Sequence, residues 1–321
     1  MKNANVLKWV LAAGFGAVLS GSAFAQTIGL GATKGGSVNQ MATAISKVVS
    51  SHAGFQLRPI PMASTQALVP VVNKGDLEFA MGNMMQLTMA VTGTGMSAGN
   101  KYENLRIAAT IIPSRWGILV RKDSDIHTIA DLKGKRIPFG HDAGPLFHHV
   151  YLGILANGGL TYDDVERFPV VLFREGWNAF KQGKVDTAVT LVGSGINNEM
   201  NATIPGGVRY IPFDDSPAAR ERMLKETPKT YLTMINPEPG LTGVVEPTLL
   251  AVYDYTLYAS KATPDDIVYK AVKAVYENES ELKEAGALFR TFDPKNMSSD
   301  QGIPYHPGAE KFYKEAGIWK R

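Results

Sequence analysis

The sequence predicts an α/β fold made of two similar lobes, each with a mostly parallel sheet. Apolar, strand-like runs alternate with amphipathic runs of helical period along the chain, a pattern typical of βαβ units. A weak internal repeat at one constant spacing relates Gly36 to Gly144 and Gly75 to Gly183. The first pair follows strands and opens helices, and the second pair ends helices before strands. This repeat favours two lobes of related structure.

The strand-like runs are short and apolar, and the helix-like runs have apolar residues three and four positions apart. The predicted strands are IGLGA, FQLRPIP, LEFAMG, RIAATII, WGILV, KRIPFG, VVLF, TAVTLV, RYIPF and TLLAVY. The predicted helices start near residues 38, 66, 145, 176, 216 and 264.

The first 25 residues are predicted to be a secretory signal peptide. Lys2 and Lys8 precede or flank an apolar run, Trp9 to Leu19, that is shorter than the roughly 20 residues of a membrane span. The small residues of Ala23-Phe24-Ala25 predict cleavage before Gln26. The alternative is a retained membrane anchor, which the cleavage site disfavours. We therefore expect export and no stable membrane insertion afterwards.

Charge and cysteine content exclude some classes of protein. The chain of 321 residues has a net charge of +3, and loss of Lys2 and Lys8 would bring it close to neutral. The longest basic stretch, KGKR at 133–136, is typical of a solvated turn rather than a nucleic-acid site. No cysteine occurs, so an exported chain must be stabilised by its apolar core rather than by disulfides.

The segment TIGLGATKGGSVNQMATAISKVVS, residues 27–50, predicts an anion-binding helix start after a strand. Ser37 is the expected N-cap, and Gln40 would complete a capping box with it. Gly35 and Gly36 lack Cβ atoms, so their N–H groups can approach a ligand closely, and the helix dipole adds positive charge there.

A second segment repeats this arrangement. KRIPFG is followed by His141-Asp142-Ala143-Gly144, and Pro145 then opens a helix that should end at Asn157-Gly158-Gly159. If the two lobes face each other, both helix starts point into one cleft at the carboxyl ends of the strands, where open α/β sheets bind ligands.

Several motifs fail when their spacing or context is considered. Lys34 precedes Gly35, which is the wrong order for a P-loop, and it stands where a dinucleotide fingerprint needs its third glycine. The esterase-like GMSAG at 95–99 has no strand before it and no helix after it, so we interpret it as a surface loop.

The histidines do not form a recognisable metal or catalytic motif. His148 and His149 are adjacent on a predicted helix and point in different directions, which disfavours a metal site that includes His141 and Asp142. No nucleophile and base pair is evident. We therefore expect no enzyme activity, no cofactor and no metal.

Taken in order, six segments resemble the solute receptors of tripartite ATP-independent periplasmic (TRAP) transporters, in particular the TAXI family. These segments are GATKGGSVNQMATAIS, LVPVVNKGDLEFAMGN, LVRKDSDIHTIADLKGKRIPFG, LTYDDV, ATPDDIVYKAVKAVYEN and IPYHPGAEKFYKEAG. The resemblance covers nearly all of the chain after the signal.

The resemblance implies a type II periplasmic-binding-protein fold, with two lobes, a hinge of two crossover strands and a location in the periplasm. Residues 26–116 plus 256–321 would form lobe 1, and residues 117–255 would form lobe 2. The hinge would lie near Ser114–Gly117 and Tyr253–Tyr258. The expected partners are a small organic anion and the TRAP membrane subunits, and a monomer is expected.

The resemblance and the two helix starts together imply a ligand site. Its first loop fits the family, whereas Gly82-Asn83-Met84 replaces a common Q-S-D, and the loop from Gly140 to Leu146 lacks the family's hydroxyl donors. Arg115 and Arg174 are candidate carboxylate partners, although both are more often surface residues. Trp116 or Trp177 could add an apolar wall, and Phe173, Trp177 and Phe180 could instead be core. The predicted ligand-binding residues are Lys34, Gly35, Gly36, Ser37, Asn83, Met84, Arg115, Trp116, His141, Asp142, Ala143, Gly144, Leu146, Phe147, Arg174, Gly193 and Ser194.

Together these features predict a periplasmic receptor that captures a carboxylate, such as an amino acid, a keto acid or a more apolar acid, for an ion-driven TRAP transporter. The alternatives are a binding protein of an ATP-driven importer or of a sensor. A less favoured alternative is an exported enzyme on the same fold, with His141, Asp142 and His148 in the cleft.

Overall fold

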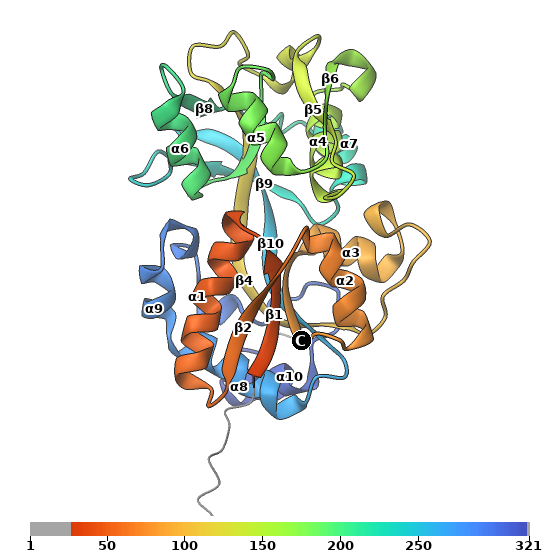
Figure 1. The fold of residues 1–321 in the computed structure, drawn as a ribbon, viewed down its shortest axis with the longest axis vertical. Helices are drawn as coiled ribbons and strands as arrows, with labels where there is room; N and C mark the ends of the chain where they lie inside the picture. The colour runs from red at the N-terminus through yellow and green to blue at the C-terminus, as the bar shows by residue number, and fades with distance from the viewer. Residues whose placement is uncertain (1–26, 320–321) are drawn as a thin grey trace, which may run out of the picture.

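Two halves joined by two long strands make up the computed structural model (Figure 1), which describes residues 27–319. The predicted signal peptide and its cleavage site before Gln26 lie outside the described residues. Within residues 27–319, no helix combines the length and apolar character needed to cross a membrane.

One mixed sheet of eight strands runs through both halves, in the order β2-β1-β3-β10-β4-β7, with β8 paired to β4 and β9 paired to β10. β5 and β6 form a separate parallel pair. The strands are β1 (Thr27–Thr33), β2 (Gln56–Met62), β3 (Phe79–Asn83), β4 (Leu105–Arg121), β5 (Arg136–Gly140), β6 (Glu166–Val170), β7 (Ala188–Leu191), β8 (Val208–Tyr210), β9 (Tyr231–Ile235) and β10 (Thr248–Ser260).

The helices cover the sheet in each half (Figure 1). They are α1 (Gly36–His52), α2 (Thr65–Lys74), α3 (Met84–Thr92), α4 (Leu146–Asn157), α5 (Phe173–Lys181), α6 (Gly195–Thr203), α7 (Pro217–Glu226), α8 (Asp265–Glu277), α9 (Glu279–Glu284) and α10 (Pro307–Glu315). Short 3-10 turns occur at Gly95–Ser97, Ile129–Leu132, Tyr162–Asp164, Ala287–Phe289 and Pro294–Asn296.

The antiparallel pair β4 and β10 connects the halves. β4 pairs with β10 from Leu105 to Trp116, and its far end pairs with β7 and β8. β10 pairs with β3 at one end and with β9 at the other. The predicted strands RIAATII and WGILV are therefore one continuous strand. Because β10 runs against its neighbours, the sheet is mixed rather than mostly parallel.

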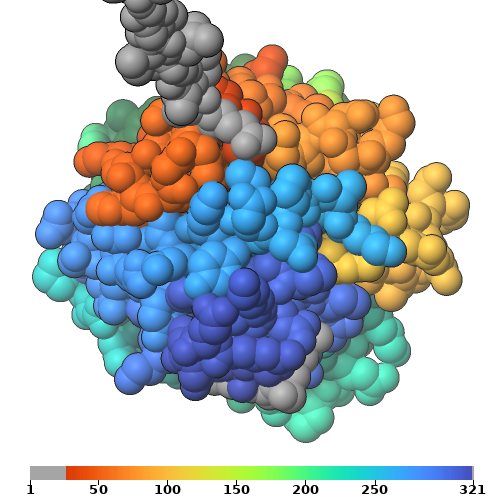
Figure 2. Space-filling view, turned by 90° about the horizontal axis from the view of Figure 1, so that it is seen from below, coloured from red at the N-terminus to blue at the C-terminus, as the bar shows by residue number. Residues whose placement is uncertain are grey.

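Segments from both ends of the chain build the lower half of Figure 1, which contains α1, α2, α3, α8, α9 and α10, whereas the upper half contains α4, α5, α6 and α7. Figure 2 shows the N-terminal segments in orange beside the C-terminal segments in blue, and α1 packs against α8 in this region. The core of this half joins β1, β3, β10, α1 and α8 in one apolar cluster. A smaller cluster around β7, β8 and α6 fills part of the upper half. The sequence did not predict α3, α6 or β9 as separate elements.

The predicted capping box at the start of α1 is wrong. α1 begins at Gly36, its N-cap is Gly35, and no side chain caps it. Gly35 has φ of 158° and Gly36 has φ of 76°, so the glycine pair turns the chain one residue earlier than a Ser37 cap would. Ser37 lies inside the first turn, and its hydroxyl therefore does not occupy the N-terminal N–H groups.

The loop interpretation of GMSAG at 95–99 agrees with the structure in outline. The segment forms a 3-10 turn after α3, and Ser97 is buried and accepts a hydrogen bond from Gln66 Nε2 at 3.0 Å. Ser97 is therefore a packing residue rather than an exposed nucleophile.

We predict that Gly308→Ala destabilises the lower half. Gly308 lies in α10 against the start of α8, where an added Cβ would overlap the backbone oxygen of Asp265. Overpacking against backbone costs about 1–3 kcal/mol. Urea denaturation should show this loss, whereas Lys311→Ala on the exposed face of α10 should change the unfolding free energy by less than about 1 kcal/mol. Equal stabilities for the two variants would contradict the close packing of α10 on α8.

Candidate functional site

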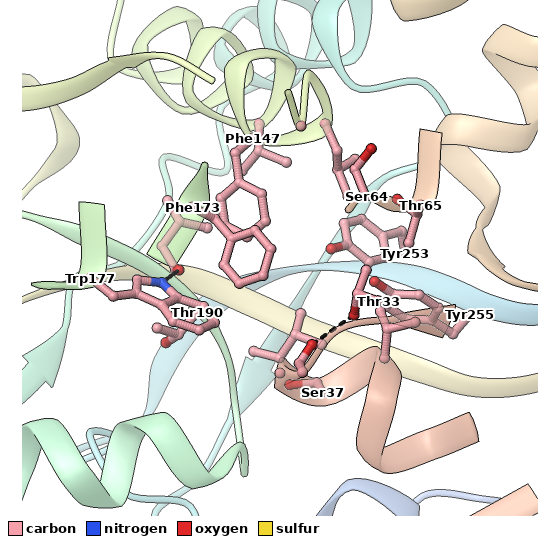
Figure 3. A pocket seen from close by; sticks show the side chains of 18 residues that line it. Thr33, Ser37, Ser64, Thr65, Phe147, Phe173, Trp177, Thr190, Tyr253 and Tyr255 are labelled. Atoms are coloured by element: carbon pink, nitrogen blue, oxygen red, sulfur yellow. Dashed lines mark hydrogen bonds between the residues drawn. The ribbon is translucent and has the colours of Figure 1, made fainter. Parts of the chain in front are cut away.

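A pocket with a volume of about 60 Å³ lies where the two halves meet, and we call it the central pocket (Figure 3). Such a volume holds a few water molecules or a small ligand. Its lining residues are Thr33, Gly35, Gly36, Ser37, Val38, Ser64, Thr65, Gly144, Leu146, Phe147, Val150, Phe173, Trp177, Val189, Thr190, Leu191, Tyr253 and Tyr255. None of these lining residues is charged.

Three aromatic side chains from the upper half form one wall of the central pocket. Phe147 is the second residue of α4, and Phe173 and Trp177 are one turn apart on α5. The rings of Phe147 and Phe173 stack with centroids 5.1 Å apart, and Trp177 meets Phe173 edge-on at 4.8 Å. Trp177 Nε1 donates to the Val189 carbonyl at 2.8 Å, which fixes the indole. The wall offers an apolar, aromatic surface.

The helix starts at the central pocket lack side-chain caps. Neither α1, which begins beside Gly35, nor α4 or α5 has a side-chain hydrogen bond at its N-cap. By contrast, the N-cap of α2, Ser64, accepts from Ala67 N–H at 3.3 Å. Residues of the first turns of α1, α4 and α5 all line the pocket. In the first turns of α4 and α5, the N–H groups of Phe147 and Glu175 donate to the Gly144 and Leu172 carbonyls. The remaining N–H groups and the positive dipole ends of three helices still border one pocket, which favours an anion.

Tyr253 and Tyr255 of β10 form the opposite side of the central pocket, across from Trp177 (Figure 3). Their rings are 5.6 Å apart and both are buried. Thr33 closes the lower edge, and its hydroxyl donates to the Gly35 carbonyl at 2.7 Å. The pocket thus has an aromatic wall, a hydroxyl-bearing wall and helix starts between them.

Six of the predicted site residues line the central pocket. They are Gly35, Gly36, Ser37, Gly144, Leu146 and Phe147. Two predicted neighbours in the same loops do not line it: Lys34 is exposed, and Ala143 hydrogen-bonds through its N–H to the Val171 carbonyl at 3.2 Å.

Arg174 lies at the rim, on the second residue of α5. Its guanidinium reaches Gly35 so closely that a Cβ there would collide with Nη2. The side chain is exposed, rests over the Phe173 ring at 5.9 Å and makes no ion pair with any described residue. A free cation therefore stands beside the uncapped start of α1.

Other predicted ligand-binding residues lie elsewhere. Arg115 borders a separate small cavity near Glu238, and burial lowers its pKa. Trp116 is fully buried and packs edge-on against Phe213 at 5.5 Å. Arg115 and Trp116 are successive residues of β4 and point to opposite faces of the sheet. Trp116 shares the face of Tyr253 but packs beside it rather than lining the pocket.

Asn83, Met84, Gly193 and Ser194 support the pocket from outside its lining. Asn83 caps α3 by accepting from Gln86 N–H at 2.9 Å, and Met84 is core. Ser194 donates to the Leu191 carbonyl at 2.7 Å and follows Gly193, which turns the chain after β7 with φ of 82°. These residues hold lining residues in place.

His141 and Asp142 lie in a second cavity of about 540 Å³, which we call the His141 groove. It also contains His148 and Glu175. His141 has φ of 61°, stacks between Phe147 and Tyr151, and its Nδ1 makes no hydrogen bond. Among the residues described, no group of three or more His, Asp or Glu side chains is arranged to hold a metal ion.

Burial keeps the histidines of the His141 groove neutral. Burial, together with the nearby His148, lowers the pKa of His141 to about 4, and Glu175 opposes this shift. Burial also lowers the pKa of His148. Neutral imidazoles at pH 7 are poor anion partners, so the groove differs in character from the central pocket.

Sequence reasoning missed most of the polar lining. Ser64 and Thr65 follow the carboxyl end of β2, and Thr190 lies near the end of β7, so their position after strands was a usable signal. Tyr253 and Tyr255 lay inside the predicted hinge, where their alternation along β10 places both on one face. Phe173 and Trp177, weighed as possible core, line the pocket.

The described fold resembles several solved structures. It matches the periplasmic binding protein BugD with a TM-score of 0.58 and 12% identity, covering 92% of this chain and 99% of that one. PhnD1 from Prochlorococcus marinus, in complex with methylphosphonate, matches with a TM-score of 0.56 and 12% identity, over 91% and 98% of the two chains. MatC from Rhodopseudomonas palustris, with bound malate, matches with a TM-score of 0.54 and 17% identity, over 91% and 97%. The two-lobed α/β binding-protein fold predicted from the sequence is confirmed.

A family model also matches nearly the whole described chain. The NMT1-like family model covers residues 30–317, so the chain belongs to the NMT1-like family.

We predict that His141 makes folding stability fall between pH 6.5 and pH 4. Its pKa is about 4 in the folded protein and near 6.5 when unfolded, so the unfolded state takes up a proton first as pH falls through this window. The loss is on the order of 3 kcal/mol by pH 4 and is absent above pH 6.5.

His141→Asn tolerates the left-handed backbone and removes this titration. Denaturant titrations at several pH values should show a shallower loss of stability in the variant. His127→Asn, at an exposed position, should retain the wild-type slope. Equal slopes for His141→Asn and wild type would rule out the buried neutral imidazole.

Proposed function

We propose that this member of the NMT1-like family is an exported solute-binding protein that captures a small organic anion and delivers it to a membrane transporter. The convergence of three uncapped helix starts on an uncharged pocket carries the proposal. Each uncapped N-terminus offers N–H donors and about half a positive charge. The role is binding rather than catalysis.

Arg174 supports an anionic ligand. It stands at the rim beside Gly35 without an acidic partner among the described residues, so it can attract a carboxylate as the halves approach. Because its side chain is exposed, its contribution is modest and screened by salt. The helix starts supply the interaction inside the pocket, and Arg174 supplies attraction outside it.

The remainder of the ligand should be apolar or aromatic. Phe147, Phe173 and Trp177 present ring faces and edges to the pocket, and Leu146 and Val150 continue the apolar surface. Burying an apolar side chain against such a wall contributes about 1.5–3 kcal/mol. Proteins of the same fold hold malate and methylphosphonate, so a small anion is compatible with the fold.

Ligand capture would close the two halves as lobes. We retain residues 26–116 plus 256–321 as lobe 1 and residues 117–255 as lobe 2, with hinges near Ser114–Gly117 in β4 and Tyr253–Tyr258 in β10. A register irregularity between Tyr255 and Thr256 gives β10 a natural place to bend. Closure of this kind is a ligand-driven shift of population.

The transporter partner proposed is an ion-driven TRAP membrane complex, and the location proposed is the periplasm. Both rest on the resemblance of the chain to TAXI receptors and on the predicted signal peptide. Uptake by cells expressing this chain with candidate TRAP membrane subunits would test the partner. Uptake that requires ATP but no ion gradient would favour an ATP-driven importer instead.

We predict that small carboxylates stabilise the purified protein. A panel of short aliphatic and aromatic carboxylates should raise the thermal transition, and their neutral amides should not. At about 100 times its dissociation constant, a true ligand adds roughly 2.7 kcal/mol to the unfolding free energy. If no acid of the panel shifts the transition, the proposed organic-anion receptor is wrong.

We predict that Arg174→Gln weakens carboxylate binding about two- to fivefold at low salt, and by less at high salt. Removal of an exposed rim charge explains both the size and the salt dependence. Arg58→Gln removes the same charge from an exposed position on β2 away from the pocket and should leave affinity unchanged. Calorimetry at two ionic strengths checks this. An identical loss in both variants would point to net charge rather than to position.

A further inference from the structure

A strip of buried polar side chains runs along one face of the sheet beneath the central pocket. The register pairs Asn83 with Tyr255 and Tyr253 with Ser114, and Trp116 follows two residues along β4. Directly paired residues, and residues two apart on one strand, share a face. All five side chains are at most 4% exposed. We call this strip the floor, and Tyr253 and Tyr255 are its members that line the pocket.

Asn83 faces the floor as a hydrogen-bond donor. Its Oδ1 is occupied by Gln86 N–H at 2.9 Å, which fixes the orientation of the amide. Its Nδ2 is buried and has no acceptor other than the neighbouring hydroxyl of Tyr255. An amide NH2 can only donate, so the Tyr255 oxygen is the atom that must accept.

The two tyrosine hydroxyls leave one O–H free to donate. Burial raises the pKa of Tyr255 to about 12, while hydrogen bonding from Asn83 and Tyr253 opposes the rise. Burial also raises the pKa of Tyr253, so both hydroxyls keep their protons at pH 7. Between two adjacent hydroxyls only one hydrogen bond can form, and the other O–H must donate elsewhere. Because both residues line the central pocket, this second O–H can donate to a ligand there.

Two further donors lie on the floor without acceptors. Ser114 Oγ and Trp116 Nε1 are buried and make no hydrogen bond in the described structure. The Trp116 ring lies 5.7 Å from that of Tyr253, which places its N–H in the same layer. Buried polar atoms without partners are rare and costly. Neither Ser114 nor Trp116 lines the central pocket, so the hydroxyls of Tyr253 and Tyr255 are the groups of the floor that a ligand can reach.

Three carbonyl oxygens around the central pocket already accept hydrogen bonds from side chains of the protein. The Val189 carbonyl accepts from Trp177 Nε1, the Leu191 carbonyl accepts from Ser194 and Asn197, and the Gly35 carbonyl accepts from Thr33. No carboxylate lines the pocket among the described residues. An ammonium group has three donors and a charge, and this site offers it no anionic partner.

From this arrangement we infer that the pocket selects carboxylic acids that carry an acceptor oxygen and no amino group, and that it rejects α-amino acids. This inference rests on the proposed organic-anion function and narrows its substrate class. The carboxylate lies at the helix starts, the apolar body lies against Phe147 and Trp177, and the acceptor oxygen faces Tyr253 and Tyr255. An α-ammonium group would lose its water in a pocket whose described lining offers it neutral hydroxyl oxygens but no anionic partner.

Matched trios of ligands test the inference on the wild-type protein by calorimetry. Each trio keeps one carbon skeleton: lactate, propionate and alanine; 2-hydroxyisocaproate, isocaproate and leucine; 3-phenyllactate, 3-phenylpropionate and phenylalanine. In the trio whose size fits, the hydroxy acid should bind more tightly than the unsubstituted acid, and equal binding of the two would overturn the selection for an acceptor oxygen. The amino acid should bind about tenfold more weakly, or worse.

Two variants assign the selectivity to the floor. Asn83→Asp keeps an oxygen to cap α3 but replaces the donor by an anionic acceptor, so the preference for the hydroxy acid over the amino acid should fall about tenfold or more. Tyr255→Phe removes a hydroxyl without a charge change, and the hydroxy acid should lose its advantage over the unsubstituted acid. Asn178→Asp adds the same charge at an exposed position on α5 and should keep the wild-type ratios.

The outcomes test the ligand selectivity separately from the proposed organic-anion function. If amino acids bind as well as their hydroxy counterparts, the inference is overturned and the organic-anion receptor stands. If acids of every trio fail to bind, the proposed function itself fails. Should either variant fold poorly, as judged by its thermal transition, the wild-type trios alone still decide the selectivity.

Discussion

The antiparallel pairing of β4 with β10 is the constraint on which the rest of the structure depends. It runs from Leu105 to Trp116 on one strand and from Ala251 to Ser260 on the other, and both strands continue into the upper half. Because this ladder crosses the boundary between the halves, it joins them and determines which of their surfaces face each other. It also carries Tyr253, Tyr255 and Ser114 into the floor of the central pocket. The sheet is therefore both the connection and one wall of the site.

Sequence periodicity predicted the parts of the fold that depend on local patterns. The α1 and α4 segments, their preceding strands and the glycine turns were recognisable because apolar period and turn chemistry agree there. The start of α1 was placed wrongly because Ser37 and Gln40 satisfy the capping pattern, while Gly35 and Gly36 adopt backbone angles that begin the helix earlier. The capping pattern of a single sequence indicates which residue could cap the helix, but it does not give the backbone angles of the turn that precedes it. β9 was missed because its strand character depends on pairing with a distant β10.

The site was predictable where it consists of backbone and was poorly predictable where it consists of side chains from distant segments. Gly35, Gly36 and Gly144 lie at strand ends that any α/β cleft would use, and they line the central pocket. Arg115 and Trp116 do not, because their surroundings depend on a register that only the folded sheet reveals: Arg115 borders another cavity, and Trp116 packs against Phe213 and Tyr253. Trp177 was ambiguous for the same reason: an aromatic at helical spacing can face a core or a cavity with equal ease.

An uncharged pocket with helix starts has a consequence for release as well as capture. A buried salt bridge to arginine would hold a carboxylate strongly only after both charges are stripped of water, and separating them again is costly. Helix N-termini bring fixed, partial charges that need no such desolvation, so in the proposed receptor the ligand would be held by geometry that exists only while the halves are together. The glycines make that geometry attainable, since Gly36 has φ of 76°, and a Cβ at Gly35 would collide with the Arg174 guanidinium where it now lies. If the halves separate as proposed, the N-termini of α4 and α5 move away from the N-terminus of α1. The partial charges that attract the ligand are then shared between two lobes, and no ion pair has to be broken. A receptor that must surrender its ligand to a partner gains from this division, because opening alone weakens binding.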